Sequence, residues 1–154
     1  MEMLIVFGAK YLIIVSVAAL LWSLYILKGK KRQYLIGLTV VALPVAFLLS
    51  RVAGHFYYNA RPFVVGNFTP LISHAADNGF PSDHMLLAAL LATLVFFVNA
   101  RLGTIAWVVA LLVGLSRVAA GVHHTGDIVG SAIISIIAVF IAHYILFLSK
   151  KIRV

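Results

Sequence analysis

The sequence predicts an all-helical membrane protein, a polytopic bundle of about five transmembrane helices that forms a single domain over residues 1–154. Three observations lead to this fold class. Of the 154 residues, 64% are hydrophobic and only 10% are charged, whereas soluble domains are about half apolar and about one quarter charged. The apolar residues also fall into five long segments. A water-soluble enzyme is therefore excluded, and so is a disordered chain, which needs few apolar residues and many charges.

The five helices are predicted from the length of these segments, because a helix needs about 20 mostly apolar residues to cross a bilayer. The first segment starts close to Met1, where a signal peptide would also lie, but no clear small-residue cleavage site follows it. Pro44 lies in the second segment and is expected to kink that helix without ending it. The predicted segments are 5–27, 34–57, 83–100, 104–120 and 127–148.

The basic residues predict how the chain is oriented in the membrane. The net charge is +8, with 12 Lys and Arg against 4 Asp and Glu. In a soluble protein this balance would indicate nucleic acid, but basic residues also collect in the cytoplasmic loops of membrane proteins. We therefore expect no nucleic-acid partner and a multi-pass protein of the inner (plasma) membrane. The basic residues assigned to the cytoplasmic side are Lys28, Lys30, Lys31, Arg32, Arg101, Lys150, Lys151 and Arg153.

The chemically distinctive residues fall on the opposite, extracytoplasmic side of this topology. They form three clusters, each next to the end of a predicted helix. Because the topology brings all three to one membrane face, we expect their arginines, histidines and aspartates to share one pocket. The clusters are Arg61-Pro62-Phe63, Pro81-Ser82-Asp83-His84, and Ser116-Arg117 followed by His123 and Asp127.

Two features of these clusters suit an anion such as phosphate. Arg61 and Arg117 provide planar, permanently charged groups that match phosphate oxygens. Pro81 before Ser82 is typical of a helix start, where main-chain N–H groups and the helix dipole favour a negative ligand.

The histidines suit nucleophilic and acid–base chemistry. His123 and Asp127 are four residues apart and share a face of a helical turn. Asp127 is therefore expected to accept a hydrogen bond from one ring nitrogen of His123, which leaves the other nitrogen free as a nucleophile. His84, on a different helix, is expected to donate a proton.

Other interpretations fit parts of this pattern. Arg117 near a helix end also fits a side chain that reaches the membrane interface, and Asp83 with His84 also fits a helix cap. A Zn²⁺ site needs three or four converging ligands, and two arginines would repel a cation, so no metal or other cofactor is expected. Transport and non-catalytic lipid binding are the rival functions. Transporter sites, however, usually lie near the bilayer midplane between repeated halves, and no repeat is visible here.

The three clusters resemble the signature of the type 2 phosphatidic acid phosphatase family, which reads Lys-x6-Arg-Pro, Pro-Ser-Gly-His and Ser-Arg-x5-His-x3-Asp. The similar stretch runs from about Arg61 to Ser131. Within the family, the chain is most similar to the bacitracin-resistance type of undecaprenyl-diphosphate phosphatase. That type shares the Arg-Pro-Phe-Val start, a loop like residues 71–77, and Pro-Ser-Asp-His in place of Pro-Ser-Gly-His.

The chain departs from the family pattern in three places. Gly54 stands where the family has its lysine, and Arg51 is the nearest basic residue upstream and a candidate substitute. His124 and Thr125 follow His123, where the family often has Tyr-Pro. The family commonly has six membrane helices, one more than is predicted here. In the shared loop, His74 and Asp77 fit either loop ordering or substrate recognition.

The resemblance implies a metal-independent lipid phosphatase without a cofactor. In this family pattern His123 would attack phosphorus and form a phosphohistidine, Asp127 would orient His123, and His84 would protonate the leaving oxygen. The phosphoryl oxygens would bind Arg61, Arg117, Ser82 and main-chain N–H groups. Undecaprenyl diphosphate is the preferred substrate. The alternatives are phosphatidylglycerophosphate, phosphatidic acid and a lipid A phosphate. Membrane lipid is the only other partner implied, and the oligomeric state is left open.

Overall fold

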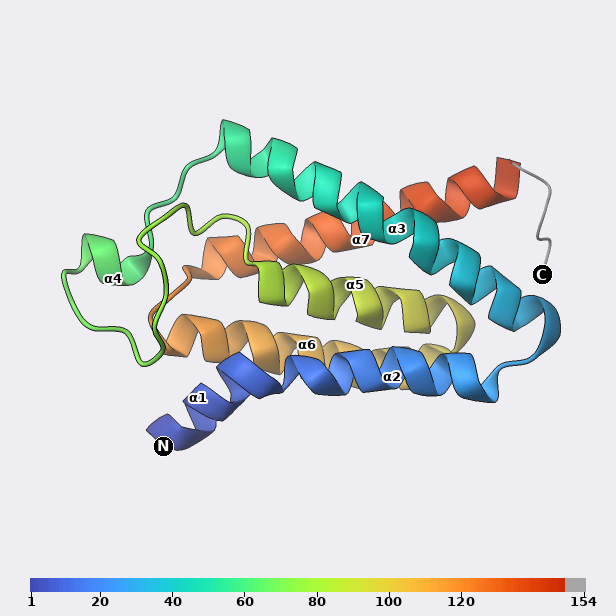
Figure 1. Ribbon diagram of the computed structural model, residues 1–154, viewed down its shortest axis with the longest axis horizontal. Coiled ribbons are helices and arrows are strands. Elements are labelled where there is room, and N and C mark those ends of the chain that lie inside the picture. Colours follow the sequence, from blue (N-terminus) through green and yellow to red (C-terminus); the bar gives the residue numbers. More distant parts are fainter. Residues whose placement is uncertain (149–154) are drawn as a thin grey trace.

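The chain folds into a bundle of helices in a computed structural model, which describes residues 1–148 (Figure 1). Within this range no β-strand forms, and Ala60 and Asn78 make one isolated bridge. The all-helical prediction is therefore confirmed. The helices are α1 (Glu2–Tyr11), α2 (Ile13–Ile26), α3 (Gly29–Phe56), α4 (Pro62–Val65), α5 (Asp83–Val98), α6 (Ala100–Ala119) and α7 (Thr125–Leu148).

Each of the five predicted segments forms helix, but the number of complete spans is only approximately five. Helices α3, α6 and α7 are long and apolar enough to cross a membrane, and α3 continues through Pro44. The first segment is divided into α1 and α2, which are bent by 41° and together make a fourth candidate span. Helix α5 has 16 residues, about 24 Å of helix, against a hydrocarbon core of about 30 Å.

Helix α5 can be short because it lies at the centre of the bundle. Its side chains are buried along most of its length, including Leu90, Leu94 and Val95, and it packs against α2, α3, α6 and α7. The outer helices instead expose large apolar residues such as Phe47 and Phe140, as expected for surfaces that face lipid. The bundle therefore has a protein-covered centre and a lipid-facing exterior.

Several helix ends lie together at one end of the bundle. The end of α3, the start of α5 and the α6–α7 turn all lie there, together with α4 and the loop that follows it (Figure 1). In the α6–α7 turn, Gly121 has a φ of +77°, and a Cβ there would lie 2.6 Å from the Phe68 ring. A side chain at this position would therefore meet both backbone strain and a clash. The turn that carries His123 is fixed against the 66–82 loop in this way.

Candidate active site

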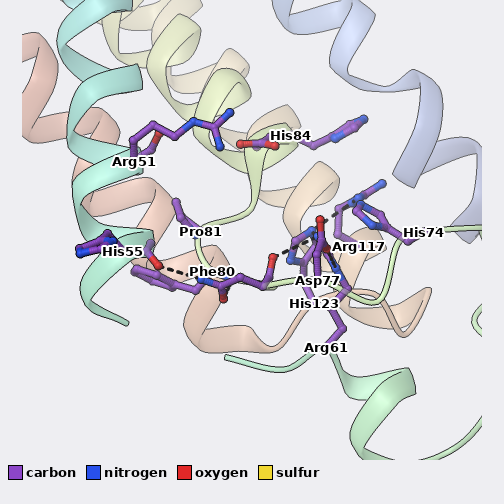
Figure 2. A pocket seen from close by; sticks show the side chains of 14 residues that line it. Arg51, His55, Arg61, His74, Asp77, Phe80, Pro81, His84, Arg117 and His123 are labelled. Carbon is purple, nitrogen blue, oxygen red and sulfur yellow. Dashed lines mark hydrogen bonds and ion pairs between the residues drawn. The ribbon is translucent and has the colours of Figure 1, made fainter. Parts of the chain in front are cut away.

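A pocket at this end of the bundle contains residues from all three predicted clusters (Figure 2). Its walls come from the end of α3, the 66–82 loop, the start of α5, the end of α6 and the α6–α7 turn. Asp83 and Pro81 line it, whereas Ser82 and Asp127 lie behind its surface. The basic and imidazole side chains that line the pocket are Arg51, His55, Arg61, His74, His84, Arg117 and His123.

The hydrogen bonds of His123 define which of its ring nitrogens carries the proton. Nδ1 lies 2.9 Å from the carbonyl oxygen of Gly79, and a carbonyl oxygen can only accept. Nε2 lies 3.3 Å from Nη1 of Arg61 and 3.4 Å from Nη2 of Arg117, and guanidinium groups can only donate. The ring is therefore protonated at Nδ1 and carries its lone pair on Nε2, between two cations.

Burial favours the same neutral form of His123. The side chain is 2% exposed, and burial lowers the pKa of His123 below its ordinary value because it penalises the charged ring. The hydrogen bond from the ring to Asp127 opposes this effect, while the charges of Arg117 and Arg61 add to it. His123 is therefore neutral at pH 7, with Nε2 available for attack.

Asp127 fixes the turn that carries His123. Its Oδ2 lies 3.4 Å from His123 Nδ1, farther than the Gly79 carbonyl that the sequence did not indicate. The same carboxylate accepts hydrogen bonds from Asn59 Nδ2 at 2.7 Å and from the main-chain N–H of His124 at 2.8 Å. The His124 ring points elsewhere, with Nε2 3.1 Å from the Ala60 carbonyl oxygen. Of the two adjacent histidines, the pocket is lined by His123.

Arg61 is held by three hydrogen-bond acceptors besides its contact with His123. Its Nε donates to Asp77 Oδ1 at 2.8 Å, and its Nη1 and Nη2 donate to the main-chain carbonyls of Val122 at 2.9 Å and Asn78 at 3.3 Å. Burial tends to raise the pKa of Asp77, but the hydrogen bond and charge of Arg61 hold it below its ordinary value. Asp77, whose role the sequence left open, thus anchors a pocket arginine.

Arg117 is positioned by the N-terminal helix. Its Nη1 lies 3.4 Å from the Ala9 carbonyl oxygen. A Cβ on the preceding Gly8 would lie 2.9 Å from Ser116 Cβ, so the absence of a side chain allows α1 to approach Ser116 and Arg117. The Nε of Arg117 is buried without a hydrogen-bond partner among residues 1–148. The small Gly8-Ala9 pair in a bulky segment was the only sequence signal for this contact.

One main-chain N–H at the start of α5 is already bonded within the protein. The main-chain N–H of Ser82 donates to Ser131 Oγ at 2.8 Å, so that N–H group faces α7 and not the pocket. Ser131 Oγ in turn lies 3.0 Å from the Ser82 carbonyl and 2.7 Å from the Asp127 carbonyl. The Ser82 hydroxyl is buried without a partner in the described part of the chain. His84, in the first turn of α5, reaches the pocket.

Gly54 has a packing reason to lack a side chain. A Cβ at this position would lie 3.0 Å from the Phe80 carbonyl oxygen and 3.5 Å from Pro81 Cδ. The loop therefore packs where the family lysine would stand. Arg51, one turn earlier on α3, lines the pocket, with its guanidinium carbon 5.0 Å from the centre of the Phe47 ring.

Asn78, which sequence reasoning missed, and His74, whose role it left open, also belong to the site. The Asn78 side chain accepts from the N–H groups of Asn59 and Phe80 and donates to the carbonyls of Gly54 and Tyr57, so it joins the 66–82 loop to α3. The ring of His74 lies 6.0 Å from the His123 ring, edge to face. Burial lowers the pKa of His74, and the charges of Arg61 and Arg117 add to this effect. Only polarity within the loop marked Asn78, whereas His74 belongs to the 71–77 stretch that resembles the bacitracin-resistance type.

The sequence and the fold define the class of protein. Residues 52–151 match the PAP2 superfamily, and the chain belongs to this family of membrane phosphatases. It is 33% identical over 144 residues to a Bacillus subtilis (strain 168) protein named undecaprenyl-diphosphatase BcrC, a match that covers 92% of this chain and 72% of the relative.

A second relative and a solved structure are also similar to the chain. The chain is 31% identical over 115 residues to the bacitracin transport permease protein BcrC of Bacillus licheniformis, a match that spans 74% of this chain but only 57% of the relative. The crystal structure of Aquifex aeolicus LpxE superimposes with a TM-score of 0.68 at 25% identity, covering 92% of this chain and 81% of that one. The family expected from the sequence motifs is therefore confirmed.

Proposed function

We propose that the protein is a metal-independent membrane phosphatase that hydrolyses undecaprenyl diphosphate to undecaprenyl phosphate and inorganic phosphate. The observation that carries this proposal is the lone pair on Nε2 of His123, held between the guanidinium groups of Arg61 and Arg117. A nucleophile flanked by two fixed cations suits attack on a phosphoryl group. The substrate is inferred from the name of the Bacillus subtilis relative.

In the first step, Nε2 of His123 attacks the terminal phosphorus and forms an N–P bond. The bond from phosphorus to the bridging oxygen breaks, and its electron pair leaves with the lipid phosphate. Arg61 and Arg117 hold the remaining phosphoryl oxygens and stabilise the charge that develops on them. The Nδ1–H stays bonded to Gly79 and faces Asp127, which stabilises the positive charge that the ring acquires.

In the second step, water attacks the phosphohistidine. The N–P bond breaks, its electron pair returns to Nε2, and inorganic phosphate is released. His84, which gives a proton to the leaving oxygen in the first step, takes one from the attacking water in the second. The sum is one lipid diphosphate and one water converted to one lipid phosphate and one phosphate.

Metal independence is supported by the chemistry of the pocket. Positive charge next to the nucleophile is already supplied by Arg61 and Arg117, which would repel a metal cation at the same place. Within residues 1–148, no group of three or more His, Asp or Glu side chains is arranged to hold a metal ion. The pocket arginines instead match an anionic ligand.

An extracytoplasmic active site is supported by the distribution of charge along the bundle. The basic α2–α3 region, with Lys28 in the connection and Lys30 in the first turn of α3, lies at the end of the bundle opposite the pocket (Figure 1). Basic loops favour the cytoplasmic side. Reporter fusions at residues 30 and 75 test this orientation, and an outward-facing reporter at residue 30 would reverse it.

Transport is the rival function, and the name of the Bacillus licheniformis relative raises it. Against it, the pocket arginines and histidines gather at one end of the bundle, whereas transporter sites usually lie near the midplane. Purified protein should release phosphate from undecaprenyl diphosphate in the presence of EDTA, and the His123→Ala variant should not. The same assay should be run on other lipid phosphates, including phosphatidylglycerophosphate and phosphatidic acid, to compare their rates of turnover. Faster turnover of one of them would change the assigned substrate but not the reaction.

A further inference from the structure

We infer that Arg51 forms a second phosphate subsite, which holds the lipid-side phosphate of a diphosphate substrate. This inference rests on the proposed function and adds to it a basis for preferring diphosphates to monophosphates. Three observations support it: the wall of the pocket on which Arg51 lies, the lack of other partners for its guanidinium group, and the lipid-facing surface of α3 below it.

The position of Arg51 matches the side on which the leaving group must lie. His123, Arg61 and Arg117 form one wall of the pocket, while Arg51 and His55 come from α3 on the other (Figure 2). Phosphoryl transfer places the attacking and leaving oxygens or nitrogens roughly in line through phosphorus. A phosphoryl group attacked by His123 therefore directs its leaving group away from that wall, toward α3. In a diphosphate, this leaving group is the lipid phosphate.

The guanidinium group of Arg51 is free to bind that phosphate. Arg61 is committed to Asp77 and to main-chain carbonyls, and Arg117 contacts Ala9 and His123. Arg51 makes no hydrogen bond or ion pair with any of residues 1–148, and its recorded contact is with the face of the Phe47 ring. A permanently charged, planar group without a carboxylate partner suits two oxygens of a phosphate.

The surface of α3 below Arg51 can accommodate the lipid chain. Val40, Leu43 and Phe47 precede Arg51 at spacings of three and four residues, so all four share one face of the helix. These three apolar side chains are 65%, 40% and 59% exposed. A lipid phosphate on Arg51 would thus have its chain along this apolar face, while the terminal phosphate reaches His123.

This position differs from that of the family lysine. Gly54, which occupies the lysine position, packs against the Phe80 carbonyl, and Arg51 lies nearly one helical turn closer to the lipid. Arg51 therefore serves the leaving phosphate and does not substitute for the lysine at the transferred one. It is a specificity-determining residue in this view, and its removal should matter only when a second phosphate is present.

The test compares wild type, Arg51→Gln and Arg51→Lys on undecaprenyl diphosphate and on undecaprenyl phosphate, which share one tail. Because a charged hydrogen-bonding pair is lost, Arg51→Gln should lower kcat/KM for the diphosphate by about ten- to a hundredfold. Its effect on the monophosphate should stay within about twofold. For the diphosphate, the kcat/KM of Arg51→Lys should lie between that of wild type and that of Arg51→Gln. Arg32 is an exposed basic residue at the other end of α3, so Arg32→Gln is the matched control. It should leave kcat/KM unchanged for both substrates.

A binding measurement keeps the test decisive if the monophosphate turns over too slowly. Methylenediphosphonate carries two phosphoryl groups without a cleavable bridge, whereas inorganic phosphate carries one. In Arg51→Gln, the inhibition constant of the diphosphonate should rise about tenfold, and that of phosphate should stay within about twofold. Equal changes for the two inhibitors, or no change for either, would overturn the inference. A wild-type protein inactive on every lipid phosphate would instead refute the proposed function.

Discussion

Nδ1 of His123 lies 2.9 Å from the carbonyl oxygen of Gly79. This main-chain contact is shorter than the 3.4 Å between the same nitrogen and Asp127 Oδ2. The tautomer of His123 is therefore fixed by backbone as well as by the carboxylate. Asp127 also binds Asn59 and the N–H of His124, so its carboxylate orders the turn while it faces the imidazole.

This arrangement predicts unequal effects at the two residues. His123→Ala should reduce kcat to the uncatalysed background, because it removes the nucleophile. Asp127→Asn should retain measurable activity, about ten- to a hundredfold below wild type, because Gly79 still orients the ring while a buried, charged hydrogen bond is lost. His124→Ala, at a ring directed to Ala60, is the control and should remain active. Complete inactivity of Asp127→Asn in folded protein would show that Gly79 does not orient the ring.

The low pKa of His123 predicts how activity depends on pH. Protonation of Nε2 removes the nucleophile, so activity falls as the pH drops through the pKa of His123. Burial lowers this pKa below the ordinary 6.5, and the acid limb of kcat/KM should therefore lie below pH 6.5. Nitrogen NMR of labelled histidine separates this titration from that of the substrate and should show Nε2 unprotonated at pH 6.5. A protonated Nε2 at that pH would contradict the geometry.

The role of His84 predicts an effect of the leaving group. A lipid phosphate leaves as a stable anion and needs little help from an acid, whereas an alkoxide is strongly basic and needs a proton. His84→Ala should therefore lower kcat/KM more for a lipid monophosphate than for a diphosphate with the same tail. This pattern is opposite to the one expected for Arg51→Gln. Equal losses on both substrates would make His84 a phosphate-binding residue and not an acid.

The contact between α1 and α6 predicts that the N-terminal helix affects catalysis. Gly8→Leu should displace α1 from Ser116, disturb the Ala9 carbonyl that binds Arg117, and lower kcat/KM by about tenfold. Leu4→Ala, at a residue 75% exposed on the same helix, should have little effect. In an Arg117→Ala background, Gly8→Leu should cost little further activity. If Gly8→Leu lowers kcat/KM as much in the Arg117→Ala background as in wild type, the substitution causes a general packing defect and does not act through Arg117.

The features that could be predicted from the sequence are those set by composition and short spacing. The apolar segments predicted the helices, and the polar clusters at their ends predicted that Arg61, His84, Arg117 and His123 would come together. The break at Leu12 was not predicted, because the first segment contains no proline and its one charged residue, Lys10, also fits an unbroken helix. Helix α5 is shorter than a usual span because neighbouring helices cover it, which local sequence does not reveal.

Contacts that depend on loop conformation could not be predicted. The carbonyl of Gly79 binds His123 from 44 residues away, and the Asn78 side chain bonds Gly54 from 24 residues away. Main-chain carbonyls occur at every position, so residue type does not mark the one that binds a catalytic ring. The small Gly8-Ala9 pair likewise gains its meaning only when α1 packs against Arg117.

The most direct measurement is the identification of a phosphorylated residue during turnover. Enzyme mixed with undecaprenyl diphosphate labelled at the terminal phosphate is quenched in base within milliseconds, because phosphohistidine survives base, and the labelled peptide is sequenced by mass spectrometry. The geometry predicts one labelled site, Nε2 of His123, and no label in His123→Ala. Label on another residue, or a phosphate burst that persists in His123→Ala, would contradict nucleophilic catalysis by His123.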